Sequence, residues 1–111
     1  MRDEEIAWAA GLFEGEGCIT EVNGRFAVAV TNTDEWVIRR FAGIVVVGRS
    51  YGPYRNSEND GQIRKPFWSW TAHEEDGFDL LQMLGSWLSP RRLERAYELT
   101  GISFPVKTLP I

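Results

Sequence analysis

The chain has 111 residues, a net charge of −4 and one cysteine, Cys18, which excludes an internal disulfide and, with His73 alone, a zinc site. Its 43% hydrophobic and 13% aromatic content is enough for the core of one domain, which we expect to span residues 1–111. We expect Cys18 to be a partly buried structural thiol. No apolar run is long enough to cross a bilayer and no basic-then-apolar leader opens the chain, so we expect an intracellular, cytoplasmic protein without a membrane partner.

The first predicted element is a helix that begins with Asp3 as its N-cap and ends at residues 14–17. Its apolar positions recur at helical spacing and form one buried face: Ile6, Ala9, Ala10 and Phe13. A second line with the same spacing is nearly all small: Ala7, Ala10, Gly11 and Glu14. Glycine inside a helix costs about 1 kcal/mol relative to alanine, so Gly11 needs a compensating contact. A closely packed second helix would provide it, and the line is self-complementary, as the interface of a two-fold dimer requires.

Two acids and two glycines end this helix, in the order Glu14-Gly15-Glu16-Gly17. Acids are disfavoured at the negative end of a helix dipole, so we expect a cation near them. The simpler interpretation is a surface helix with a glycine C-cap and two solvated glutamates.

Beyond Gly17 the spacing of apolar residues changes from helical to strand-like. Residues 19–22 and 25–31 form two predicted strands, and the Asn23-Gly24 pair between them favours a tight hairpin turn. In the second strand the two faces alternate, with Phe26, Val28 and Val30 on one and Arg25, Ala27 and Ala29 on the other. One face of the hairpin is therefore predicted to be buried and the other open.

The rest of the chain continues in the same way. A second helix is predicted next, capped by Asn32 or Thr33, with its apolar residues between Trp36 and Val45. Two strands follow at 48–54 and 67–72, with a polar loop at 56–62 between them. The chain then forms a helix at 74–88, a last helix that starts at Ser89-Pro90, and an extended tail at 101–111. Four strands in hairpins with helices on one face predict an α+β fold with a four-stranded antiparallel sheet.

Residues 9–19 carry a longer pattern, Ala-Ala-Gly-Leu-Phe-Glu-Gly-Glu-Gly-Cys-Ile, which resembles the motif of the LAGLIDADG homing endonuclease family. Glu14 and Glu16 stand at the two acid positions, where the family pattern has Asp. The resemblance extends over most of the chain: Val30-Thr31-Asn32, Val46-Val47-Gly48, Trp68-x-Trp70 and Leu88-Ser89-Pro90-Arg91-Arg92. It implies an αββαββα core, with residues 1–17 as the motif helix and a saddle-shaped sheet that leaves one face open for DNA.

The resemblance also implies an activity. It points to a site-specific endonuclease of the kind found in mobile genetic elements, which cleaves double-stranded DNA as a homodimer with Mg²⁺ or another divalent cation. Glu16 matches the metal-binding acid of the motif, and the carbonyl oxygen of Gly15 could add a second ligand. Glu14 matches the acid that caps and packs the helix. A chain with one motif supplies one carboxylate site, and cleavage of both strands needs two.

Two further residues match the polar surroundings of that site. Asn32 matches the residue that positions a water molecule, and Arg91 matches a basic residue near the scissile phosphate. Each also has a simpler interpretation, since Asn32 is a natural helix N-cap and Arg91 is a natural solvated residue on a helix surface.

The open face of the sheet is the expected DNA-binding surface, with basic residues for phosphates and polar or aromatic residues for base edges. The residues expected there are Thr20, Val22, Arg25, Ala27, Ala29, Arg49, Tyr51, Arg55, Arg64, Lys65, Phe67, Ser69 and Thr71. The net charge of −4 argues against a nucleic-acid partner unless the basic residues gather on that face. Two alternatives therefore stay open, a DNA-binding protein or regulator on this scaffold that does not cleave, and a protein-interaction module.

Overall fold

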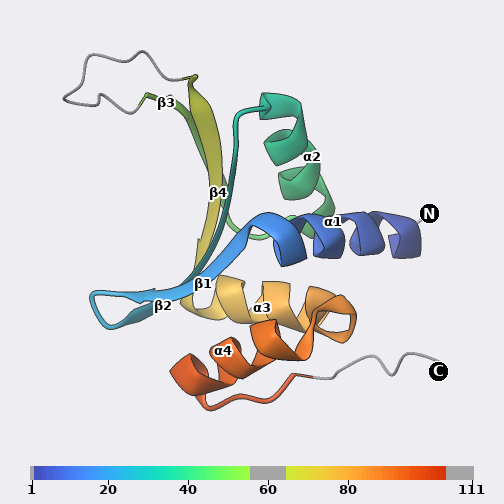
Figure 1. Ribbon diagram of the computed structural model, residues 1–111, viewed down its shortest axis with the longest axis vertical. Helices are drawn as coiled ribbons and strands as arrows, with labels where there is room; N and C mark the ends of the chain where they lie inside the picture. The colour runs from blue at the N-terminus through green and yellow to red at the C-terminus, as the bar shows by residue number, and fades with distance from the viewer. Residues whose placement is uncertain (1, 56–64, 105–111) are drawn as a thin grey trace.

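The computed structural model describes residues 2–55 and 65–104 (Figure 1). The elements are α1 (Arg2–Glu16), β1 (Gly17–Val22), β2 (Arg25–Asn32), α2 (Glu35–Val45), β3 (Arg49–Tyr54), β4 (Phe67–His73), α3 (Glu74–Leu84), a 3-10 turn η1 (Gly85–Trp87) and α4 (Pro90–Thr100). This order confirms the predicted α+β fold.

The four strands form one antiparallel sheet in the order β1-β2-β4-β3. Val28 of β2 lies opposite Ile19 of β1 and Ala72 of β4, and Val30 lies opposite Trp70. Because side chains alternate across a strand, these positions share the face that the helices cover. Figure 1 shows α1 running away from the sheet with α2 on one side of it and α3 on the other. Among residues 2–55 and 65–104, no helix covers the opposite face of the sheet.

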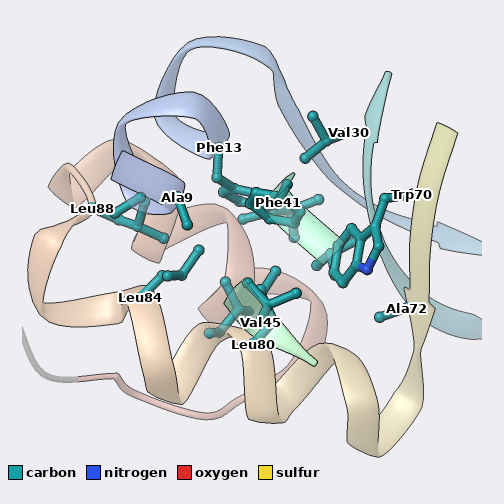
Figure 2. Packing of buried hydrophobic residues seen from close by; sticks show 14 of the residues in the cluster. Ala9, Phe13, Val30, Phe41, Val45, Trp70, Ala72, Leu80, Leu84 and Leu88 are labelled. Atoms are coloured by element: carbon teal, nitrogen blue, oxygen red, sulfur yellow. The ribbon is translucent and has the colours of Figure 1, made fainter. Parts of the chain in front are cut away.

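The core lies between α1, α2, α3 and the covered face of the sheet (Figure 2). Its apolar side chains include the four predicted on α1, since Ile6, Ala9, Ala10 and Phe13 are all buried. Trp70 is fully buried, packs edge-on against Phe41 with ring centroids 4.8 Å apart, and donates its indole N–H to the carbonyl of Val47 at 2.9 Å. That hydrogen bond satisfies the polar atom of a tryptophan that otherwise lies among apolar side chains.

Three predicted helix boundaries differ from the structure. Helix α1 already includes Arg2, so Asp3 lies within its first turn. The N-cap of α2 is Asp34, whose carboxylate accepts the backbone N–H of Trp36 at 2.9 Å. Helix α3 ends at Leu84 and does not continue to residue 88. The chain continues as the 3-10 turn η1, and Leu88 after it is extended.

Cys18 is exposed, which corrects the expectation of a partly buried thiol. The reason is its place in β1, where Ile19 points into the core and Cys18 therefore points to the uncovered face. The predicted loop at 56–62 lies outside the described residues, as does the tail beyond 104. Of that tail, residues 101–104 are described, and Phe104 is buried against the core. None of the helices in the described ranges is long and apolar enough to cross a membrane.

Candidate nucleic-acid interface and metal site

Hydrogen bonds in both directions join the end of α1 to the start of α4. We call Glu14, Gly17, Ser89 and Arg92 the α1–α4 junction. The carboxylate of Glu14 accepts the backbone N–H of Ser89 at 2.7 Å and its hydroxyl at 2.9 Å. The guanidinium of Arg92 donates to the carbonyl oxygens of Gly17 at 2.6 Å and Glu14 at 2.8 Å. An acid thus lies at a helix N-terminus and a cation at a helix C-terminus, each in its favoured place.

This junction identifies the cation expected beside the acids of α1. It is Arg92, supplied by the same chain, so the Glu14 carboxylate needs no metal to be compatible with the helix end. Ser89 and Arg92 belong to the segment quoted for the resemblance, but neither was predicted as a site residue. A signal for them was present, because Ser89, Arg92, Leu93 and Ala96 follow the helical i, i+3, i+4, i+7 spacing of one face.

The structure brings Glu16 and Asn32 together. The side-chain N–H of Asn32 donates to the Glu16 carboxylate at 2.8 Å, and its side-chain oxygen accepts the backbone N–H of Asp34, also at 2.8 Å. Asn32 therefore links the end of α1 to the start of α2. The two residues line an open hollow of about 390 Å³, which Thr31, Thr33 and Phe67 complete. Asn32 is a neighbour of the helix cap but not the cap itself.

The metal ligands available in the described part of the chain are few. No group of three or more His, Cys, Asp and Glu side chains gathers within residues 2–55 and 65–104. The Glu16 carboxylate is exposed, and the Gly15 carbonyl lies in the last turn of α1, where carbonyl groups lack partners within the helix. Mg²⁺ commonly binds through one or two carboxylates and keeps several water molecules. Glu16 and Gly15 fit such an ion as part of a site, and they do not form a closed cage.

Arg91 lies beside Glu14 and not in the hollow of Glu16. Its guanidinium is 4.0 Å from the Glu14 carboxylate, and its side chain is 80% exposed. The hollow is lined by residues of α1, β2 and β4 and the residue after β2, while Arg91 belongs to the first turn of α4. The structure therefore places Arg91 at the rim of the α1–α4 junction with its side chain in solvent.

The residues predicted for a dimer interface fall into different environments. Ala10 is 1% exposed and packs in the core of its own chain, and Glu14 is engaged at the α1–α4 junction. Ala7 is half-buried and Gly11 is exposed. A Cβ atom built on Gly11 or on Gly15 meets no atom within 4 Å. The exposed small residues of α1 are therefore Gly11 and Gly15, and the smallness of Ala10 serves the core.

The uncovered face of the sheet carries the residues that alternate with the core positions. We call it the open face. Between β1 and β2 the register pairs Cys18 with Ala29, Thr20 with Ala27 and Val22 with Arg25. Between β2 and β4 it pairs Ala29 with Thr71 and Thr31 with Ser69. Between β3 and β4 it pairs Arg49 with Thr71, Tyr51 with Ser69 and Tyr54 with Phe67. All predicted members in β1 to β4 thus share this face. Cys18, Thr31, Tyr54 and His73 also lie on it and were not predicted. Ala27 is only 3% exposed, so it offers little surface to a partner on this face.

One of the basic residues on the open face is paired with an acid. Arg25 forms an ion pair with Glu74, with 3.5 Å between the guanidinium and the carboxylate. Arg49 is exposed on β3, and Arg55 and Lys65 are exposed beyond the end of β3 and before the start of β4. Arg64 lies outside the described residues. The basic residues therefore flank a central strip of alanine, serine and threonine.

This architecture is the homing-endonuclease-like fold. The chain matches a crystal structure of the homing endonuclease I-CvuI in complex with the I-CreI target DNA, in the presence of magnesium and with the DNA not cleaved. The TM-score is 0.58 over 88% of this chain at 18% sequence identity, a level at which the likeness concerns the fold. The chain spans 65% of the length of that protein. No family model and no curated protein matches the sequence.

Proposed function

We propose that the chain is the subunit of a homodimeric, metal-dependent endonuclease that cleaves double-stranded DNA at specific sites. The observation that carries the proposal is the Glu16 carboxylate, held at 2.8 Å by Asn32 in a hollow at the margin of the open face. The homing-endonuclease-like fold supports it, since the neighbour with this fold is a DNA complex. The carboxylate and the surface for DNA thus meet at one edge of the molecule.

The open face supplies the contacts to DNA. Arg49, Arg55 and Lys65 are exposed and suit phosphate oxygens, which fix the register of a protein on the duplex. Ser69 and Thr71 lie on the inner strand β4 and Tyr51 lies on the edge strand β3, and their polar side chains suit the edges of bases.

At the hollow, Glu16 and the Gly15 carbonyl would hold the divalent ion. When bound, such an ion supplies charge neutralisation at the phosphate and activation of water. Asn32 orients the carboxylate through one N–H of its amide, and its second N–H is the group that suits an attacking water molecule. The chain provides one such carboxylate, so cleavage of both strands requires a second copy.

The second copy would pack against the exposed glycines of α1. Gly11 and Gly15 lie one helical turn apart on the surface and leave room for a helix at close distance. A two-fold axis through this helix face would place the two Glu16 carboxylates near each other at the ends of the paired helices. The dimer is thus part of the same proposal as the cleavage.

A DNA-binding protein that does not cleave is the second candidate. The net charge of −4 and the ion pair between Arg25 and Glu74 favour it, because both weaken the attraction of the open face for phosphates. Such a protein would use the same open face and would not need the carboxylate of Glu16.

Selection from a randomised double-stranded DNA library tests the proposal. The wild-type chain should enrich cleaved sites with Mg²⁺ and none with EDTA, and Glu16→Gln should retain binding to the selected sites without cleaving them. Binding without cleavage by the wild type would favour the second candidate. Cleavage by Glu16→Gln would remove Glu16 from the proposed site.

A further inference from the structure

We infer that Arg92 is a positioning residue, which fixes the turn that carries Glu16 and so sets the direction of its carboxylate. The inference rests on the proposed function for the ion that Glu16 binds. It assigns a role to a side chain that is not among the residues that line the hollow. The role follows from the two carbonyl groups that Arg92 holds.

The two carbonyl groups flank the proposed ligands. Arg92 Nη2 donates to the carbonyl of Glu14 at 2.8 Å, and Nη1 donates to the carbonyl of Gly17 at 2.6 Å. Gly15 and Glu16 are the residues between them. The guanidinium therefore spans this segment and holds both of its ends, which come from α1 and from the first residue of β1.

The segment needs an external hold because of its sequence. Gly15 and Gly17 flank Glu16, and glycine restricts the backbone less than any other residue. A Cβ atom at Gly15 would meet nothing within 4 Å, so packing does not fix that position. At Gly17 the chain passes close to Phe13, since a Cβ there would lie 2.5 Å from the Phe13 carbonyl oxygen. The transition from α1 to β1 is thus tight on one side of Glu16 and open on the other.

Arginine suits this task better than lysine. Its planar fork presents two donors at fixed directions, so one side chain reaches two separate carbonyl oxygens. The third donor group, Nε, is buried without a hydrogen-bond partner, 3.9 Å from the Glu14 carboxylate. The side chain is only 19% exposed and is held by α4, which the Ser89 contacts fix to the same end of α1. The α1–α4 junction is therefore built around the fork.

Asn32 provides the second hold on the carboxylate. It donates to Glu16 from β2, while Arg92 acts on the backbone from α4. With both in place, the backbone and the side chain of Glu16 are fixed from different elements. Loss of Arg92 should leave the Asn32 contact possible but remove the restraint on the peptide groups of residues 14–17.

A purely structural arginine would lower stability without changing the metal response. The test therefore compares magnesium binding with stability in one set of proteins: the wild type, Arg92→Lys, Arg92→Gln and the control Ile44→Val. Ile44 is buried, and its carbonyl accepts from Arg2 at the opposite end of α1 at 2.9 Å. Ile44→Val should therefore destabilise the core without reaching the turn at Glu16. Arg92→Lys keeps the positive charge, so it can be used for the comparison if Arg92→Gln does not fold.

Magnesium titration followed by thermal melting gives the first readout. Partners that orient metal ligands typically change metal affinity by about 10- to 100-fold, so both Arg92 variants should need at least about tenfold more Mg²⁺ for half of the stabilisation. Ile44→Val should melt at a lower temperature with an unchanged magnesium midpoint. An unchanged midpoint in the Arg92 variants would overturn the positioning role and leave the proposed metal site standing.

Amide hydrogen exchange without metal gives a second, independent readout. Exchange at residues 15–18 should quicken in Arg92→Lys and stay unchanged in Ile44→Val, because only the former releases the turn. Unchanged exchange at these amides in Arg92→Lys would overturn the inference whether or not the protein binds metal. A wild type that ignores Mg²⁺, with exchange that still quickens in Arg92→Lys, would overturn the proposed metal site and leave the hold on the turn.

Discussion

The two carboxylates at the end of α1 are two residues apart in sequence and bind different elements of the fold, Glu14 the start of α4 and Glu16 the end of β2. Glu14 lies on the helix side, where it accepts two hydrogen bonds from Ser89 and lies about 4 Å from the guanidinium groups of Arg91 and Arg92. Glu16 lies at the margin of the open face and accepts one hydrogen bond, from Asn32, among the described contacts. One acid therefore completes the fold, while the other has a carboxylate exposed to solvent, which the proposed function uses for an ion.

The largest expected effect is on stability at Glu14. Glu14→Ala should lower the free energy of unfolding by about 2–3 kcal/mol, because it removes charge-assisted hydrogen bonds to Ser89 and leaves Arg92 without its nearby anion. Glu16→Ala should change it by no more than about 0.5 kcal/mol, since its carboxylate is exposed. Urea unfolding of both variants measures the contrast. Equal losses would contradict the division of roles between the two acids.

The division of roles was predictable in part from the sequence. Local spacing identified the buried face of α1, the alternation of β2 and the polar end of the first helix, since each depends on residues a few positions apart. The resemblance to the LAGLIDADG family assigned Glu16 and Asn32 to one site, and a hydrogen bond joins the two side chains in the structure. The α1–α4 junction joins residues 75 and more positions apart, and no local pattern specifies which arginine reaches which carbonyl.

The burial of small residues was also difficult to predict from the sequence. Ala10 belongs both to the apolar line of α1 and to the small line, and only the packing of the whole chain decides that it is buried. Gly11 next to it remains exposed. Cys18 shows the same effect in a strand, where the choice of face is set by the registration of Ile19 on Val28. The spacing of residues gives the period of a helix or strand, and tertiary contacts decide which of its faces is buried.

The second prediction extends the contrast to the outer surface of α1. Gly11→Leu should dissociate the proposed dimer, since a large side chain would hold the two helices apart, while the fold of each chain stays intact because nothing lies within 4 Å of a Cβ at this position. Gly43→Leu on α2 is the matched control, because its Cβ also meets nothing within 4 Å. Sedimentation at tens of micromolar (about the range of modest dimer affinities) measures the mass of each variant. A wild type that sediments as a monomer would remove the interface on α1.

The third prediction concerns the cations of the open face. Replacing Arg25 and Arg49 together by Ala should weaken DNA binding and reduce its salt dependence by about 2 in the log–log slope, about 1 for each lost phosphate contact. The matched control replaces Arg39 and Arg95, which form ion pairs on α2 and α4. Fluorescence anisotropy from low to moderate salt gives the slopes. Equal slopes for the two double variants would place the DNA away from the open face.

The smallest expected effect comes from Glu74, the acid that pairs with Arg25. The two side chains are 44% and 62% exposed, and exposed ion pairs of this kind are worth about 0.2–1 kcal/mol. A phosphate that binds Arg25 must displace this partner, so Glu74→Gln should tighten DNA binding by up to about fivefold. Glu98→Gln is the matched control, because it removes the same charge from a similar exposed pair with Arg95 on α4. Removing a negative charge anywhere raises the attraction for DNA slightly, so the gain of Glu74→Gln over Glu98→Gln isolates the release of Arg25. If both variants bind DNA with the same affinity, the Arg25 side chain is not a phosphate contact, and the cations at the β3 side of the open face must provide the binding.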